Sequence, residues 1–406
     1  MTITSRFHSI GRLGAVAALI AAVTACNMTV TNPGPIQDES LNQASAIPAL
    51  VNGMSGDLSL ALGGMTARTG LASGELVESG NFADEGFFYA GTFSGLNANT
   101  DWANAQRARW TSESGLRRMA TVLGSNFESN TDTPRAYLYA GFANRLLGEN
   151  MCQAVIDGGA AQSDSEYFKR ADSLFTRAYT LATAKSNTSV ANAALAGRAS
   201  VRAWLGNWTG AVADAALVPS TFVYNAIYGI GTSRENLYIA DQTITRREVT
   251  VWGTYWATQP KTDPRTPWDT VKTGTTITKG QDGKTNFFRQ LKYTALGSSV
   301  PLVKGAEMLI LRAENALRAG DIAGMTTLLN QARATYTGLT PLTAPATTAA
   351  AWTMLQTERG AATWLEARRL WDQRRWYAEG TSTFLNGRNK CIPISDNEMA
   401  SNPNLH

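Results

Sequence analysis

The chain has 406 residues, enough for one large domain or for two to three of ordinary size. Hydrophobic residues make up 44% of it and charged residues 17%, a balance that is typical of globular proteins and excludes a disordered chain. The formal net charge is +4, without a block of Lys or Arg, so the sequence does not favour nucleic acid as a partner.

The N-terminus has the pattern of a bacterial signal peptide. Arg6 and Arg12 provide its positive charge, and residues 13–25 form a small, apolar run. This run is shorter than the roughly 20 residues that span a bilayer as a helix. It ends in Val-Thr-Ala-Cys, which resembles a lipobox, so we expect residues 1–25 to be removed and Cys26 to carry the acyl chains. The alternative is an ordinary signal peptide followed by an unrelated cysteine.

Residues 26–38 contain two prolines and are expected to form a tether, which lifts a single domain of residues 39–406 off the lipid surface. The histidines are His8, within the signal peptide, and His406, the last residue. A His-based catalytic triad or zinc site is therefore excluded from the folded body, and we expect no metal and no cofactor. Chemistry based on carboxylates alone stays open.

Two cysteines, Cys152 and Cys391, remain beside Cys26. An exported protein occupies a compartment where disulfides persist, and two cysteines can pair in only one way. We therefore expect a disulfide between them, with two buried free thiols as the alternative.

The first predicted elements are helical. Apolar residues at helical spacing predict a helix over residues 39–62, with a kink or a late start at Pro48. Residues 63–100 are rich in Gly, Asn, Ser and aromatic residues without a clear period, and are expected to be exposed loop. A polar cap before Pro134 then starts a helix that is expected to break at Gly148.

An internal repeat follows. RASVRAWLGNWTGA, from Arg198, and RAENALRAGDIAGM, from Arg312, match at an offset of 114 residues. Each predicts an Ala-rich helix, a Gly-Asn or Gly-Asp turn and a second helix, which resembles a tetratricopeptide hairpin. Residues 147–149 give a weaker third copy.

We place such hairpins at about 134–218 and 303–337, with a further helix over 348–377. The intervening residues 219–300 are rich in Thr, Gly, Tyr and Trp and predict an insert of loops and short strands.

Four stretches, in this order, resemble the SusD/RagB family of outer-membrane nutrient-binding lipoproteins. They are the lipobox with Asn32-Pro33; Asp263-Pro264-Arg265 with Leu291-Lys292-Tyr293 and the helix of residues 303–314; Glu358-Arg359 with Glu366 and residues 369–376; and the tail Ile392-Pro393-Ile394 with Glu398 and residues 402–405. The resemblance covers essentially the whole mature chain.

The resemblance implies a mainly α fold with four tetratricopeptide-like hairpins and an irregular, loop-rich part that has few short strands and carries the ligand site. It also implies a non-catalytic protein, lipid-anchored at the outer membrane and facing the cell surface. Such a protein captures an oligomeric nutrient, a glycan or a peptide, and delivers it to a TonB-dependent transporter. Two departures from the family are the cysteine pair and the lack of an acidic run after Cys26.

The run of residues 368–376 combines arginines with tryptophans. Arg368, Trp371, Asp372 and Arg375 share a helix face. We interpret them as a buried Arg–Asp network that locks the C-terminal helix; a sugar-stacking Trp with Arg donors is the alternative.

The candidate ligand site lies in two loop regions, residues 81–102 and 252–268. Both are dense in aromatic residues interleaved with Asn, Asp, Thr and Gly, and sugars need aromatic rings for their apolar faces and polar partners for their hydroxyls. We expect the two regions to form one shallow site containing Phe87, Phe88, Tyr89, Asp101, Trp102, Trp252, Tyr255, Trp256 and Trp268. The alternative is that these rings fill the core of the irregular part.

Two other functions stay open. A tetratricopeptide-like lipoprotein scaffold in envelope assembly would explain the lipobox and the hairpins, but not the aromatic insert. A carboxylate-based glycosidase would need two facing acids, and no motif in the sequence names them.

Overall fold

The computed structural model describes residues 38–231 and 234–406. The expected signal peptide, the lipobox at Cys26 and nearly all of the tether lie outside the described residues. Asp38–Leu41 form a short 3-10 helix, η1, in an N-terminal unit, and residues 44–406 form a second unit. None of the described helices is both long and apolar enough to cross a membrane.

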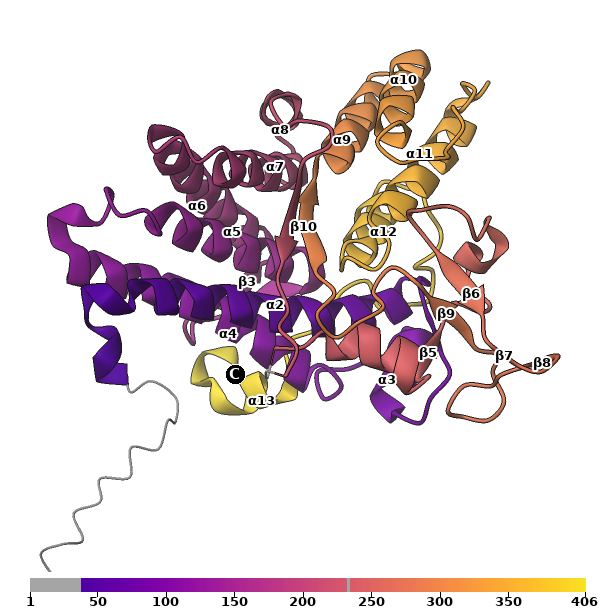
Figure 1. Ribbon diagram of the computed structural model, residues 1–406, viewed down its shortest axis with the longest axis horizontal. Helices are drawn as coiled ribbons and strands as arrows, with labels where there is room; N and C mark the ends of the chain where they lie inside the picture. The colour runs from indigo at the N-terminus through magenta and orange to yellow at the C-terminus, as the bar shows by residue number, and fades with distance from the viewer. Residues whose placement is uncertain (1–37, 232–233) are drawn as a thin grey trace, which may run out of the picture. The chain divides into compact units, whose positions relative to one another are not determined.

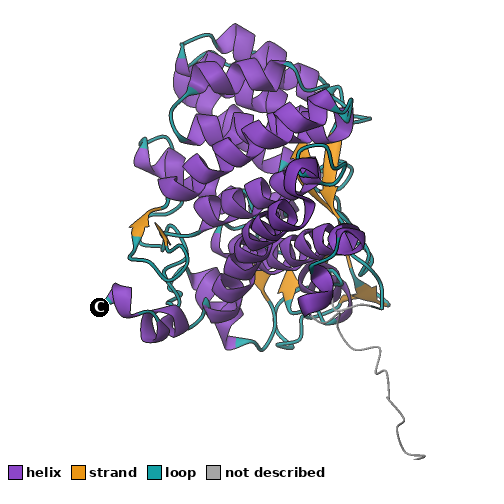
Figure 2. Ribbon diagram, turned by 90° about the vertical axis from the view of Figure 1, so that its left-hand side faces the viewer, coloured by secondary structure: helices purple, strands orange, loops and turns teal. Residues whose placement is uncertain are grey.

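Helices dominate residues 44–406 (Figures 1 and 2). The α-helices are α2 (Ile47–Ala72), α3 (Ala83–Ala90), α4 (Asn99–Leu123), α5 (Thr133–Asn150), α6 (Ser165–Ala184), α7 (Thr188–Trp204), α8 (Trp208–Ala216), α9 (Gly305–Arg318), α10 (Ile322–Arg333), α11 (Thr348–Ala362), α12 (Arg369–Ala378) and α13 (Asp396–Ser401). Shorter helical segments are η2 (Ala44–Ala46), η3 (Gly124–Asn126), the π-helical η4 (Leu237–Thr245), η5 (Tyr255–Thr258) and η6 (Pro403–Leu405).

The strands are short and pair two by two. They are β1 (Val77–Glu78), β2 (Gln153–Ala154), β3 (Gln162–Ser163), β4 (Val223–Ala226), β5 (Val249–Thr250), β6 (Trp268–Thr270), β7 (Lys272–Thr273), β8 (Thr276–Ile277), β9 (Phe288–Gln290) and β10 (Val300–Lys304). The antiparallel pairs are β1–β5, β2–β3, β4–β10, β6–β9 and β7–β8. The predicted class, mainly α with few short strands, is confirmed. The described part of residues 219–300 has loops and short strands as expected, and also the helical segments η4 and η5, which the sequence did not predict.

The start of α2 agrees with the prediction from the sequence, but the end of α2 does not. Pro48 lies in the first helical turn, where a missing N–H is tolerated, so the late start is confirmed. The helix continues to Ala72, and α3 and the start of α4 follow, so the expectation of exposed loop over residues 63–100 is wrong. Gly63 is buried within α2, where the Tyr228 ring packs against it.

The two repeated turns match in detail. Gly206 and Gly320 both have a φ of 82°, which ends α7 and α9 in the left-handed conformation. Asn207 then caps α8 by accepting a hydrogen bond from the Gly210 amide at 2.9 Å, and Asp321 caps α10 in the same way. Both hairpins are therefore confirmed. The third copy is wrong, as is the break at Gly148, because α5 runs through that residue against the Phe168 ring.

The helix predicted over residues 348–377 is two helices, α11 and α12. Between them Leu365 and Ala367 adopt positive φ values of 54° and 57°, which helical residues do not have. Tyr293 donates a hydrogen bond to the Leu365 carbonyl at 3.1 Å, and Lys292 donates to the Trp364 carbonyl at 2.6 Å. Tertiary contacts from the insert therefore hold a turn that local helical periodicity did not predict.

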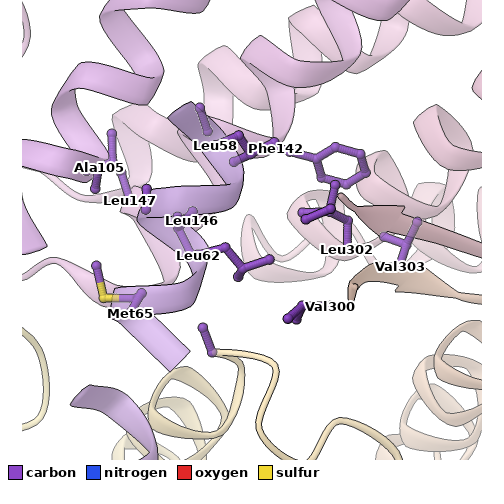
Figure 3. Close-up of a cluster of buried hydrophobic side chains, with 14 of the residues drawn as sticks. Leu58, Leu62, Met65, Ala105, Phe142, Leu146, Leu147, Val300, Leu302 and Val303 are labelled. Atoms are coloured by element: carbon purple, nitrogen blue, oxygen red, sulfur yellow. The ribbon is translucent and has the colours of Figure 1, made fainter. Parts of the chain in front are cut away.

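The core joins the long helices to the paired strands. Figure 3 shows Leu58, Leu62 and Met65 of α2 with Phe142 of α5 and residues of β10 around one buried apolar cluster. A second cluster lies among α9, α10 and α11. Helices α5 to α8 and strands β5 to β9 lie at opposite sides of the unit in Figure 1.

A buried ion-pair network locks α12, as we interpreted from the sequence. Asp372 accepts from Arg359 at 2.6 Å and from Arg375 at 2.9 Å, and Arg375 also bonds Glu314. Arg368 pairs with Glu307 at 2.8 Å. Burial would raise the pKa of Glu314, but the charge and hydrogen bonds of Arg375 outweigh it and lower that pKa to about 2.

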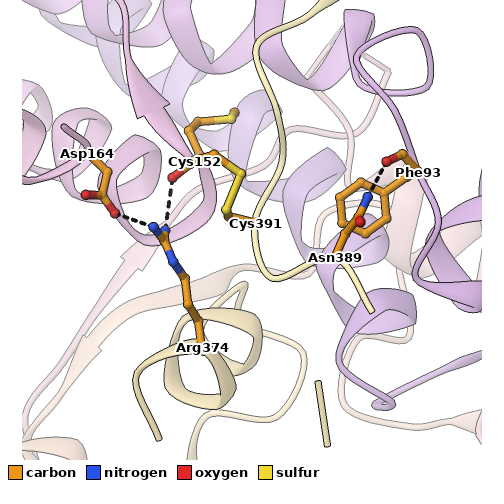
Figure 4. The surroundings of a disulfide bond; sticks show 7 residues. Phe93, Cys152, Asp164, Arg374, Asn389 and Cys391 are labelled. Carbon is orange, nitrogen blue, oxygen red and sulfur yellow. Dashed lines mark hydrogen bonds and ion pairs between the residues drawn. A yellow bond between two sulfur atoms is a disulfide. The ribbon is translucent and has the colours of Figure 1, made fainter. Parts of the chain in front are cut away.

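Cys152 and Cys391 form a disulfide, with their Cα atoms 5.0 Å apart (Figure 4). The Cys152 amide donates to the Ile392 carbonyl at 2.9 Å, so backbone and disulfide together attach the C-terminal segment to the end of α5. Nearby, Arg374 pairs with Asp164 at 2.9 Å, and the Asn389 amide donates to the Phe93 carbonyl. The C-terminal end of residues 380–391 is thereby fixed.

Candidate functional site

A cavity of about 430 Å³, here the aromatic cavity, brings the two predicted loop regions together. It is lined by Leu71, Ser73, Gly74, Leu76, Val77, Tyr89, Ala90, Gly253, Thr254, Tyr255, Trp256, Arg369, Gln373, Phe384 and Arg388. Tyr89, Tyr255 and Phe384 are 42%, 51% and 39% exposed, so three rings from three separate segments are open to solvent at its wall.

The pairing of β1 with β5 builds one side of this cavity. Val77 pairs with Thr250. This pairing places residues 252–256 near the C-terminal end of α2. Gly253 turns the chain with a φ of 81°, and the Thr254 hydroxyl caps η5 by accepting from the Ala257 amide at 3.3 Å. This local geometry sets Tyr255 and Trp256 nearly perpendicular, at 81°, with ring centroids 5.2 Å apart.

The C-terminal segment builds the opposite side through Arg388. Its guanidinium donates to the backbone carbonyls of Tyr89, Ala72 and Ala90 at 2.6, 3.2 and 3.3 Å, and lies 5.4 Å from the Phe384 ring centre. A Cβ atom at Gly91 would lie 2.9 Å from Arg388, so only glycine fits there. Burial lowers the pKa of Arg388, but an arginine stays charged at neutral pH.

Helix α12 supplies the floor. Arg369 donates to the Gln356 carbonyl at 2.8 Å and lies 5.9 Å from the Trp256 ring centre. The Gln373 amide oxygen, in the orientation that satisfies its neighbours, accepts from Arg369 at 3.2 Å. Ser73 also lines the cavity, and its buried hydroxyl has no hydrogen-bond partner among the described residues.

Three of the predicted ligand-binding residues line the aromatic cavity, namely Tyr89, Tyr255 and Trp256, but the Trp256 side chain is only 3% exposed, so it is not the open ring that we expected. Phe87 and Trp252 are exposed but do not line it. The structure places the remaining four, Phe88, Asp101, Trp102 and Trp268, in the interior.

The expectation of an exposed site is thus wrong for these four residues, because each has a partner inside the protein. The Phe88 ring stacks on the Phe93 ring with centroids 4.4 Å apart, and the Trp268 ring stacks on the Phe288 ring with centroids 5.0 Å apart. The Trp102 indole donates to Glu398 at 3.3 Å, and Asp101 pairs with Arg68 at 3.4 Å.

Sequence reasoning missed Phe384, Arg388, Arg369 and Gln373. Residues 380–389 read GTSTFLNGRN, which has the same mixture of Gly, Thr, Asn and an aromatic ring as the two predicted loops. This composition could have marked residues 380–389 as a third part of the ligand site. Arg369 and Gln373 lie in the run of residues 368–376, which we interpreted as a structural network and not as part of the ligand site.

A second cavity of about 410 Å³, here the ion-pair cavity, shares Trp256 with the first. Its charged residues are balanced: Arg265 bonds Asp263 at 2.7 Å and Glu358 at 2.5 Å, and Arg333 bonds Glu358 at 2.7 Å. Burial alone would lower the pKa of Arg265, but Asp263 and Glu358 raise it.

Comparison with known proteins shows which family the chain resembles. The SusD family matches residues 233–391, and no curated protein matches the sequence. Among solved structures, a SusD-like protein from Bacteroides fragilis is similar, with a TM-score of 0.68 at 12% identity. The alignment covers 91% of this chain and 98% of that protein's chain.

Two further structures agree. A SusD superfamily protein from Bacteroides vulgatus has a TM-score of 0.67 at 16% identity, and a surface glycan-binding protein from Bacteroides uniformis has 0.65 at 14%. Each of these two alignments covers 89% of this chain and 98% of the other protein's chain. The resemblance to the SusD/RagB family is therefore confirmed, and the protein has the SusD-like fold.

Proposed function

We propose that the protein captures a glycan in the aromatic cavity, without altering it chemically. The observation that carries this proposal is the convergence of Tyr89, Tyr255 and Phe384, all partly exposed, on one cavity with Arg, Gln and Ser side chains. Exposed rings offer flat apolar surfaces to sugar faces, and the polar groups offer partners to the hydroxyls. The similar protein from Bacteroides uniformis, described as glycan-binding, supports this choice.

A glycan array tests capture. The purified protein should bind at least one glycan on the array and leave it intact after prolonged incubation. Release of shorter sugars would favour the glycosidase, and binding of peptides alone would exclude a glycan as the nutrient.

We further propose that acylated Cys26 anchors the protein at the outer membrane, facing the cell surface, and that a TonB-dependent transporter receives the glycan. The signal and lipobox pattern supports the anchor. More than one acyl chain is expected, since a single chain binds membranes only marginally. Cys26→Ala should release the protein into the soluble fraction.

The transporter has its own test. A pull-down of the wild-type protein from solubilised membranes should recover a TonB-dependent transporter. Recovery of an envelope assembly machine in its place would favour the scaffold function.

A further inference from the structure

We propose, building on the glycan capture proposed above, that the aromatic cavity takes an acidic glycan whose carboxylate lies against Arg369 and Arg388. The feature that carries this inference is the charge of the cavity wall. Its lining contains these two guanidinium groups and, among the described residues, no Asp or Glu.

Arg388 is held by neutral groups. Among the described residues, its two terminal nitrogens donate only to backbone carbonyls, at 2.6 to 3.3 Å, and its buried Nε atom has no hydrogen-bond partner. No carboxylate of the described residues lies within ion-pair distance of it. The carbonyls orient the guanidinium group but leave its positive charge without a counter-ion.

Arg369 likewise has no ion pair within the part of the chain that the structure describes. Two carboxyl groups, those of Glu75 and Asp372, act on it from beyond ion-pair distance. Asp372 is already bonded by Arg359 and Arg375. Burial raises the pKa of Glu75 to about 8, despite the attraction of Arg369, so this carboxyl group is mostly protonated at neutral pH.

The neighbouring ion-pair cavity provides the contrast. There Arg265 and Arg333 are matched by Asp263 and Glu358, and the wall is neutral. Since a charge withdrawn from water is costly unless it is paired, the two unpaired arginines favour a ligand that brings the missing anion. Arginine binds carboxylates through charge-assisted hydrogen bonds, and the open rings of Tyr89 and Tyr255 suit a sugar face beside them.

The ligand class therefore combines a sugar ring with a carboxylate, as in a uronic acid polymer. The first test changes the ligand and leaves the protein intact. Oligosaccharides of galacturonic, mannuronic and glucuronic acid are titrated by calorimetry, each with its carboxylates free or methyl-esterified.

At least one free acid should bind, and esterification should weaken its binding about tenfold or more, the effect of losing a charge-assisted hydrogen bond. Binding of the free acid should also weaken at high salt. Equal binding of free and esterified forms, or binding of neutral glycans alone, would overturn the acidic ligand and leave glycan capture standing. Binding of no acidic or neutral glycan would overturn both.

The second test changes the protein. Arg369→Gln should weaken binding of the free acid but not of its methyl ester. The matched control is Arg333→Gln in the ion-pair cavity, which removes the same charge and should leave both affinities unchanged. Should Arg369→Gln fail to fold, Arg369→Lys, which keeps the charge, should retain most of the preference for the free acid. If the control loses as much affinity as Arg369→Gln, the effect is not local and the inference is wrong.

Discussion

Arg388 donates a hydrogen bond of 2.6 Å to the backbone carbonyl of Tyr89, across the aromatic cavity's wall. This contact ties the C-terminal segment to the end of α3 and brings Phe384 beside Tyr89 at one cavity. Because Cys391 anchors the same segment to Cys152, we expect the shape of the cavity to depend on a disulfide that lines no part of it.

The first prediction concerns that disulfide. Replacing both cysteines by serine should lower the free energy of unfolding by up to roughly 5 kcal/mol, because the sequence separation of 239 makes the closed loop long. Glycan affinity should fall too, although every ring remains. Urea denaturation and calorimetry measure the two effects. An unchanged urea midpoint would show that the bond does not stabilise the fold.

The second prediction distinguishes a core ring from a solvent-exposed ring on the same helix. Trp102→Ala should cost about 3–5 kcal/mol of unfolding free energy, since its ring is 2% exposed. Trp110→Ala is the matched control on α4, where the ring is 56% exposed, and should stay within about 0.5 kcal/mol of wild type. Comparable losses in the two variants would contradict this assignment.

Trp102 also shows how much of the site could be predicted from the sequence. Composition marked residues 81–102 and 252–268 as aromatic and polar, and the structure does join both regions at one cavity. Composition does not reveal which ring faces inward, because that depends on partners distant in sequence, such as Glu398 for Trp102. Local patterns did predict the capped turns at Gly206 and Gly320, whose hydrogen bonds are all within a few residues.

The break between α11 and α12 was not predictable for the same reason. Residues 348–377 have helical periodicity throughout, but Lys292 and Tyr293 of the insert hold the Trp364 and Leu365 carbonyls in a turn. That turn sets the position of Arg369, so the missed break and the missed site residue have one physical cause.

A third prediction tests the buried network under α12. Asp372→Ala leaves Arg359 and Arg375 without their shared partner and should cost about 3–5 kcal/mol by urea denaturation. The control is Asp172→Ala, which removes a partly exposed partner of Arg202 and should cost about 1 kcal/mol or less. An equally small loss at Asp372 would mean that the network does not lock the helix.

The fourth prediction is a pH dependence from Glu75, whose pKa burial raises from 4.5 to about 8. Between these values the folded chain holds a proton that the unfolded chain has released. The free energy of unfolding therefore falls as pH rises through this window, by at most about 1.4 kcal/mol per pH unit.

Glu75→Gln removes this dependence. The variant should become progressively more stable relative to wild type from pH 5 to pH 8, as measured by denaturation at each pH. A stability difference that stays constant over this range would show that Glu75 does not titrate there.

The most direct test of glycan capture is the affinity of Tyr89→Ala and Tyr255→Ala for a glycan identified on the array, measured by calorimetry. Each ring should contribute up to about tenfold in affinity, with an unchanged melting temperature, because both rings are open to solvent. The control is Phe87→Ala, which removes an exposed ring on α3 that does not line the cavity and should bind as wild type does. Wild-type affinity in both tyrosine variants, or an equal loss in Phe87→Ala, would contradict glycan capture at the aromatic cavity.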